Sequence, residues 1–146
     1  MTRVEKDALG LREVPDGMTW GIHTLRASEN FPPVLGPVAP ALIRAYIRVK
    51  RACARTNAEL GYLAGDRARA IEAACVRWLQ DPTAGVCPLD ALQGGAGTSL
   101  NLFVNEVIAN LALEAMGRPR GDYAALDPFD HVNLHQSTND TYPTAL

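Results

Sequence analysis

Two short stretches of the sequence gather small polar side chains of the kind that hold a negatively charged ligand. The first is QGGAGTSLN at residues 93–101, and the second is QSTND at residues 136–140. Glycines let a backbone approach a ligand, and the free N–H groups at the start of a following helix favour an anion. Thr98 and Ser99 add hydroxyl donors at that helix start. The first stretch is therefore either a carboxylate site or simply a capped helix after a flexible turn.

Common phosphate-binding motifs do not match this first stretch. A phosphate-binding loop needs a lysine before the Ser/Thr, and none stands there. Leu100 occupies the place of the third glycine of a dinucleotide-binding loop.

The second stretch has two open interpretations as well. Ser137 or Thr138 can cap a helix whose first turn carries Pro143, or the run through Asn139 can form a second cradle for a carboxylate or an amine. Neither stretch pairs a nucleophile with a base, so acyl-transfer chemistry has no support.

A metal site is weakly suggested just before the second stretch. His131 and His135 stand four residues apart, a spacing that binds metal on a helix. Pro128 predicts a bend here and no glutamate follows His131, so we expect hydrogen-bonded groups in a turn and no bound metal.

The elements that must position these groups are mainly helical. Residues 1–37 are rich in Gly and Pro and predict turns and short extended pieces. Apolar spacing predicts a helix from Ala39, with one face formed by Leu42, Tyr46, Val49 and Cys53, and a second helix with a face formed by Ala68, Ile71, Cys75 and Trp78.

A third helix is predicted from about Thr98 to Met116, ended by Gly117. It is apolar nearly all round and therefore buried, yet it carries polar side chains one turn apart: Asn101 and Asn105, then Glu106, Asn110 and Glu114. Such a helix either packs tightly against other chains or forms the wall of a polar site.

Composition narrows the class of protein. The chain has 146 residues, 47% hydrophobic and 21% charged, with a net charge of −2. This near balance argues against nucleic acid as a partner, and no stretch approaches the ~20 apolar residues of a membrane span. Three cysteines without a CxxC pair fit a reducing cytoplasm.

Taken together, the two polar stretches and their surroundings are similar to the aspartase/fumarase superfamily. The resemblance is carried by LGLREVP, WGIHTLRASENF, FVNEVIANLALEAMG and QSTNDTYPTA, and it covers essentially the whole chain. Within the superfamily, HTLRA and GGAGTS are similar to aspartate ammonia-lyases. A fumarase, a related dicarboxylate lyase and a non-catalytic carboxylate-binding module remain as alternatives.

The resemblance implies a reaction and a set of roles. Members eliminate ammonia or water from a four-carbon dicarboxylate, here L-aspartate giving fumarate and ammonium, through β-proton abstraction and an aci-carboxylate intermediate, without a cofactor. The implied substrate-binding residues are Thr98, Ser99, Ser137, Thr138 and Asn139. The family's serine base, on a loop of pattern GSSxMPxKxNP, is expected beyond Leu146, so the chain alone is expected to be inactive.

The resemblance also implies an organisation. Residues 1–137 correspond to an N-terminal domain, and residues 138–146 to the start of a central helical bundle, so the chain is expected to be the N-terminal portion of a homotetrameric lyase. Such a portion is expected to expose apolar faces of its Thr98–Met116 helix. Phe103, Phe129 and Leu134 replace residues that are commonly polar in relatives, which leaves the substrate less certain than the fold.

Overall fold

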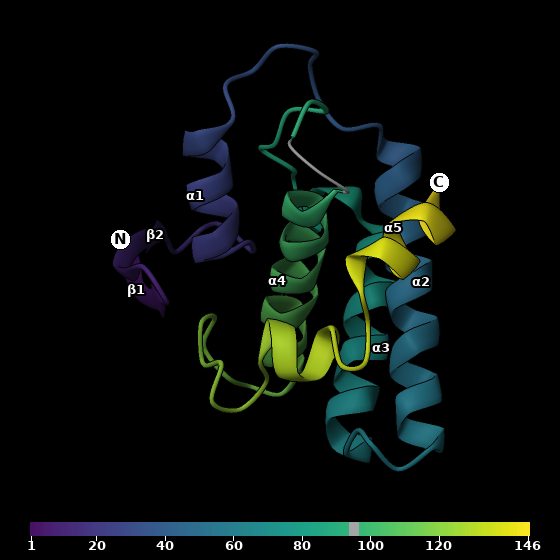
Figure 1. Cartoon of the computed structure of the whole chain (residues 1–146). Helices are drawn as coiled ribbons and strands as arrows, with labels where there is room; N and C mark the ends of the chain where they lie inside the picture. Colours follow the sequence, from purple (N-terminus) through teal and green to yellow (C-terminus); the bar gives the residue numbers. More distant parts are fainter. Residues whose placement is uncertain (94–96) are drawn as a thin grey trace.

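A long central helix with the other elements on either side of it organises the chain (Figure 1). The structure, a computed structural model, describes residues 1–93 and 97–146. Its elements in chain order are β1 (Thr2–Asp7), β2 (Gly10–Pro15), α1 (Ile22–Asn30), α2 (Pro40–Glu59), α3 (Gly65–Gln80), η1 (Pro82–Ala84), α4 (Thr98–Ala115), η2 (Pro128–Val132) and α5 (Thr138–Ala145). The predicted mainly helical fold is confirmed.

Helix α4 forms the core. Thirteen of its 18 residues are buried, because α3 packs on one side and α1 on another. It begins after Gly97 (φ 75°) and is followed by Gly117 (φ 71°), both in the left-handed region that glycine adopts without strain. The predicted terminating glycine is confirmed. The expectation that this chain exposes apolar faces of α4 is wrong, because its own helices cover them.

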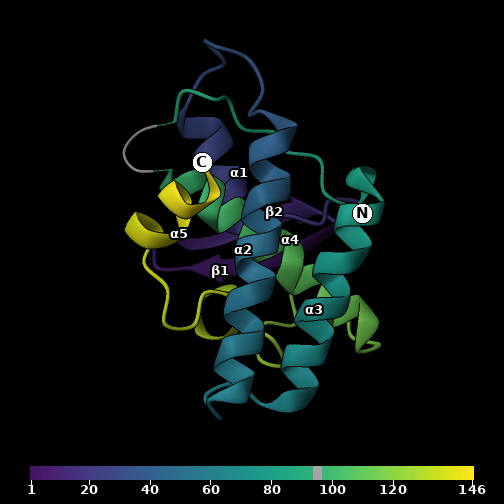
Figure 2. The same ribbon diagram turned by 90° about the vertical axis from the view of Figure 1, so that its right-hand side faces the viewer.

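Helices α2 and α3 run side by side along the molecule (Figure 2). The face predicted for α3 is confirmed, because all four of its members are buried. For α2 the prediction is partly wrong: of the predicted face only Tyr46 is fully buried, and Lys50 and Asn57 are buried instead. These two polar residues face the segment that precedes α5, which sequence periodicity does not reveal.

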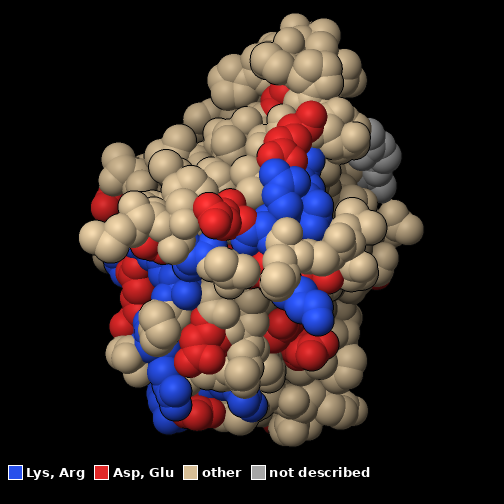
Figure 3. Space-filling model, turned by 90° about the vertical axis from the view of Figure 1, so that its left-hand side faces the viewer, with Lys and Arg blue, Asp and Glu red and all other residues tan. Residues whose placement is uncertain are grey.

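The N-terminal region is more regular than predicted. Strands β1 and β2 form an antiparallel hairpin in which Thr2 lies opposite Pro15 and Asp7 opposite Gly10. Charges of both signs intermingle over the face of the molecule on which the hairpin lies (Figure 3). Here Arg26 forms an ion pair with Asp7.

Helix α1 was not predicted, and its sequence explains why. Its N-cap is Gly21, which offers no side-chain hydrogen bond. The free N–H groups of its first turn donate instead to two buried carboxylates, Glu5 of β1 and Glu106 of α4. The helix is stabilised by residues far away in the sequence.

Helix α5 follows a short turn of π-helix, η2, and a loop. Ser137 is its N-cap and its Oγ accepts a hydrogen bond from the N–H of Asn139 (3.1 Å), as one interpretation of the sequence predicted. Pro143 lies in the second turn and not in the first, so that part of the prediction is wrong.

Among the helices that the structure describes, none combines the length and the apolar character needed to cross a lipid bilayer.

Candidate functional site

The starts of α4 and α5 lie side by side (Figures 1 and 2). The ring of Tyr142 packs against Gly97 so closely that a Cβ at Gly97 would stand 2.2 Å from it. From α2, the Tyr46 hydroxyl donates to Asn101 Oδ1 (2.7 Å) and shares a hydrogen bond with Thr141 Oγ1 (2.9 Å). Burial raises the pKa of Tyr46 to about 12, so it stays a neutral donor. The two polar stretches of the sequence are thus neighbours in space.

All five predicted substrate-binding residues occupy the first positions of these two helices. Thr98, Ser137 and Asn139 are exposed, and Ser99 and Thr138 are half-buried. Apart from the Ser137 cap, their side chains make no hydrogen bond with other described residues. Their hydroxyl and amide groups are therefore accessible to a ligand. Residues 94–96, the centre of the predicted glycine-rich loop, lie outside the described residues.

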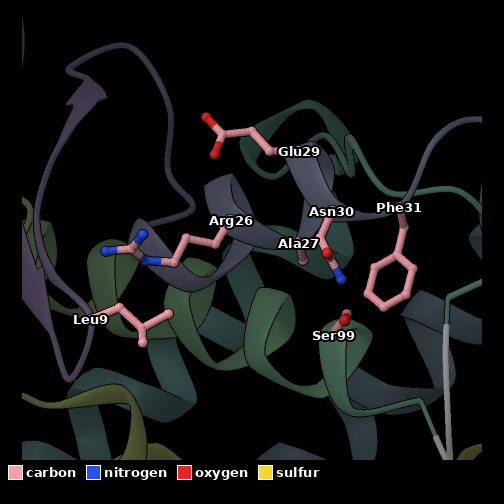
Figure 4. Close-up of a pocket in the computed structure, with 7 residues that line it drawn as sticks. All are labelled: Leu9, Arg26, Ala27, Glu29, Asn30, Phe31 and Ser99. Atoms are coloured by element: carbon pink, nitrogen blue, oxygen red, sulfur yellow. The ribbon is translucent and has the colours of Figure 1, made fainter.

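The five residues do not all face the same space, because Ser99 lines a groove to which none of the other four contributes. Ser99 points toward α1 and lines a groove of about 530 Å³ along that helix (Figure 4). The groove is also lined by Leu9, Arg26, Ala27, Glu29, Asn30 and Phe31. The guanidinium of Arg26 points to Asp7, with Arg26 Nε 2.7 Å from Asp7 Oδ2. This hydrogen bond lowers the pKa of Asp7. The guanidinium of Arg26, already paired with Asp7, therefore lies at the end of the groove away from Ser99 (Figure 4).

A buried lysine supports the segment that leads into α5. Lys50 is completely buried, and its ammonium donates to Asn133 Oδ1 (2.8 Å) and Gln136 Oε1 (2.9 Å). Its Nζ also lies 5.2 Å from the centre of the Tyr46 ring. Because burial disfavours the charged form, it lowers the pKa of Lys50 to about 7.

Asn133 is the centre of this network. Its Oδ1 also accepts hydrogen bonds from Asn101 Nδ2 (3.2 Å) and Asn105 Nδ2 (3.1 Å), both on α4. Helices α2 and α4 therefore hold the same side chain. Asn105 Oδ1 is buried and has no hydrogen-bond partner among the described residues.

The two histidines of the sequence analysis point to different partners. His131 Nδ1 accepts a hydrogen bond from the N–H of Asp127 (2.8 Å), and burial lowers its pKa. His135, which has φ 58°, places its Nδ1 3.0 Å from Asn57 Oδ1 and packs edge-on against Tyr62. Among residues 1–93 and 97–146, no group of three or more His, Cys, Asp or Glu residues is arranged to hold a metal ion.

On the opposite side of α4, Glu106 organises the start of α1. Its carboxylate accepts hydrogen bonds from the N–H groups of Gly21 (2.8 Å), His23 (2.8 Å) and Thr24 (3.1 Å). It also accepts from Thr24 Oγ1 (2.6 Å) and lies 2.9 Å from His23 Nδ1. The hydrogen bond to Glu106 raises the pKa of His23.

Sequence reasoning missed the role of Lys50 and Gln136. The available signal was composition: Lys50 is one of only two lysines, and it stands in a helix whose other cations are arginines. The polar residues of α4 were noticed, but their partners were not.

The side chains of the three departures from the common pattern of relatives make no hydrogen bonds, but two of these residues touch the networks described above. Phe103 is buried and packs edge-on against Trp78. Phe129 is 43% exposed and packs edge-on against His23. Leu134 is half-buried, and its carbonyl oxygen accepts a hydrogen bond from Asn57 Nδ2.

Comparisons with known proteins agree with this arrangement. A protein-family model described as "Lyase" matches residues 10–146. The chain is 48% identical to an aspartate ammonia-lyase of Pseudomonas aeruginosa, over 99% of this chain and 31% of that protein. It resembles the crystal structure of a fumarate lyase:delta crystallin from Brucella melitensis, with TM-score 0.91 and 51% identity over 99% of this chain and 34% of the other. It also resembles a class II fumarase from Schistosoma mansoni, with TM-score 0.90 and 34% identity over 99% of this chain and 31% of the other.

The chain thus spans about a third of the length of the proteins it matches. The match to the family model covers residues 10–146, so both polar stretches fall within the matched region.

Proposed function

The chain belongs to this lyase family, that of the aspartases and fumarases, and from that premise we propose that it is the N-terminal part of an aspartate ammonia-lyase. The complete enzyme converts L-aspartate to fumarate and ammonium. In this proposal residues 1–137 are its N-terminal domain, and residues 138–146 begin a central helical bundle.

One observation carries the proposal. The two polar stretches lie at the starts of two neighbouring helices, where their hydroxyl groups are accessible. They do so in a chain that is 48% identical to an aspartate ammonia-lyase. The start of a helix also offers free N–H groups and a positive dipole end. Together these groups form a wall suited to a carboxylate.

The chemistry explains why the wall is polar but not acidic. Removing a proton next to a carboxylate builds an intermediate whose carboxylate carries additional negative charge. In the proposed site Thr98, Ser137 and Thr138 donate hydrogen bonds to that carboxylate, and Asn139 lies near the leaving amine. Ser99, whose side chain lines the groove along α1, contributes through its free backbone N–H at the start of α4. Donors that are already in place stabilise developing charge without reorganising, which is a major source of catalytic rate.

The wall alone lacks a base. We propose that the serine base and the remaining ligands come from the rest of a homotetrameric enzyme, so the chain by itself is inactive. Three free cysteines fit the cytoplasm as its compartment.

A fumarase is the second candidate. The identity of 34% to a fumarase, against 48% to an aspartate ammonia-lyase, favours aspartate over malate as the substrate. A carboxylate-binding module without catalysis is the third.

Two measurements separate the candidates. The intact mass of the native polypeptide should be several times 15.7 kDa, and that polypeptide should form fumarate, followed by its ultraviolet absorbance, from L-aspartate. Fumarate from L-malate alone would establish a fumarase, and a native mass near 15.7 kDa with no turnover would favour the module.

Thr98→Val tests the wall itself, because it removes an exposed hydroxyl without a partner among the described residues. We expect kcat/KM for L-aspartate to fall about 100-fold, as for loss of one donor to a developing negative charge. Thr144→Val is the matched control: Thr144 is exposed on α5, its hydroxyl donates to the carbonyl oxygen of Asp140, and its loss should leave kcat/KM unchanged. Equal behaviour of the two variants would remove Thr98 from the site.

A further inference from the structure

The most unusual buried group in the chain is Lys50. It is 0% exposed, and among the described residues its ammonium has no carboxylate partner. Burying a cation without a counter-ion is costly, and an apolar side chain of similar length would avoid that cost. Packing alone therefore does not account for a lysine at this position.

The partners of Lys50 do account for it. Asn133 and Gln136 direct their side-chain oxygens to the ammonium, at 2.8 and 2.9 Å. The nitrogen ends of the two amides are also engaged: Asn133 Nδ2 donates to the carbonyl oxygen of Gln136 (3.0 Å), and Gln136 Nε2 donates to that of Val132 (2.8 Å). Each amide is therefore fixed at both ends, and the whole 133–136 turn is closed on itself around one cation.

This turn leads directly into the proposed substrate wall. Gln136 is the residue before Ser137, and the carbonyl oxygen of Ser137 accepts the N–H groups of Asp140 (3.1 Å) and Thr141 (3.0 Å) in the first turn of α5. A displacement of Gln136 would move the start of α5 with it.

We propose that Lys50 is a positioning residue of the lyase: by holding Asn133 and Gln136, it sets the place of Ser137, Thr138 and Asn139 against the substrate. This inference rests on the proposed function. Lys50 does not touch the substrate, because it is fully enclosed by protein. Helix α2 supports the same turn a second time through Asn57, whose Nδ2 donates to the carbonyl oxygen of Leu134 (2.9 Å).

The test compares Lys50→Met with Ile47→Met in the complete polypeptide. Both changes place methionine at a buried position of α2, one turn or less apart, but only the first removes the donors to the turn. We expect Lys50→Met to raise KM for L-aspartate about tenfold or more, because the displaced groups bind the substrate more weakly and about 1.4 kcal/mol of lost binding is tenfold. Its melting temperature should stay equal to or above that of the wild type, and Ile47→Met should leave KM unchanged.

A double-mutant cycle distinguishes positioning from general damage. If Lys50 acts through Gln136, then Lys50→Met combined with Gln136→Met raises KM no more than the larger single effect. Three results would each overturn the proposal. The first is additive effects of the two substitutions on KM, and the second is a KM for Lys50→Met equal to that of Ile47→Met. The third is a fall in kcat alone together with a lower melting temperature.

Amide hydrogen exchange keeps the inference testable if Lys50→Met does not fold or the wild-type polypeptide turns over no dicarboxylate. In the 146-residue chain, Gln136→Met should accelerate exchange at Asp140 and Thr141, because the start of α5 loses its support. Unchanged exchange there would refute the role of the turn. If the wild type is inactive on both L-aspartate and L-malate, the enzyme assignment is rejected. If exchange is nevertheless faster in the variant, the contact that positions the start of α5 is retained.

Discussion

Replacing Glu106 by glutamine is the most direct test of how this fold is held together. The side chain is 1% exposed, and its two oxygens accept hydrogen bonds from three backbone N–H groups, one hydroxyl and one imidazole. Glutamine has the same shape but turns one of these acceptors into an NH₂ donor. Whichever way the amide is oriented, at least one backbone N–H at the start of α1 then faces another donor.

The size of the effect follows from that count. A buried donor left without a partner costs about 1–3 kcal/mol, and hydrogen bonds to a charged acceptor contribute about 1.5–3 kcal/mol each. We therefore expect Glu106→Gln to lower the free energy of unfolding by about 2–5 kcal/mol, a large share of the 5–15 kcal/mol typical of a domain. In urea this moves the unfolding midpoint down by roughly 1–2 M.

The assay is urea unfolding followed by circular dichroism, with Glu59→Gln as the control. Glu59 is exposed on α2, so the same loss of charge should change the free energy of unfolding by less than about 0.5 kcal/mol. Amide exchange should locate the damage at Gly21, His23 and Thr24. Equal midpoints for the two variants would show that the carboxylate does not stabilise α1.

Three further outcomes are expected. Gly97→Ala should destabilise the chain more than Gly117→Ala in thermal unfolding, because both positions have positive φ, which costs about 1–2 kcal/mol, but only Gly97 is covered by Tyr142. The stability that His23 contributes is complete below its unfolded pKa near 6.5 and should be lost as pH rises through its raised folded pKa. Unfolding free energies measured against pH should show this loss. In Glu106→Gln this pH dependence should be absent. Lys50 should act in the opposite direction, because its pKa falls from 10.5 when unfolded to about 7 when folded: stability should rise between these pH values, and Lys50→Met should remove that rise.

Local sequence patterns predicted the regular core well. The apolar repeat of α3 and the glycine after α4 act within a few residues, so both could be read directly. The same holds for Ser137, whose capping partner lies two residues away.

The failures at α1 and Lys50 have one physical cause, which is that the stabilising partner is distant in sequence. Helix α1 has no cap of its own, since the carboxylate that serves it lies 82–85 residues further along the chain. Lys50 received no role from the sequence, because its partners are 83 and 86 residues away. The site prediction came from the family resemblance, and the polar residues supporting that site had no local signal.

The buried polar residues of α4 fall on two seams with different tasks. Asn101 and Asn105 are one turn apart and both donate to Asn133, on the side of the proposed substrate wall. Glu106 and Asn110 are also one turn apart, but at 100° per residue they lie about 140° around the helix from the first pair. They hold the N-terminal region, where Asn110 Nδ2 donates to the carbonyl oxygen of Thr19 (2.7 Å).

This division explains how an almost entirely buried helix carries so much polarity. The sequence left open whether α4 packs tightly against other chains or forms the wall of a polar site. Within this chain one seam holds the N-terminal region, and the other supports the proposed wall. Since each seam is hydrogen-bonded to a different segment, changes at Glu106 act on α1, whereas changes at Asn133 act on the turn before α5. The support of the proposed wall is therefore structurally separate from the support of the N-terminal region, although one helix provides both.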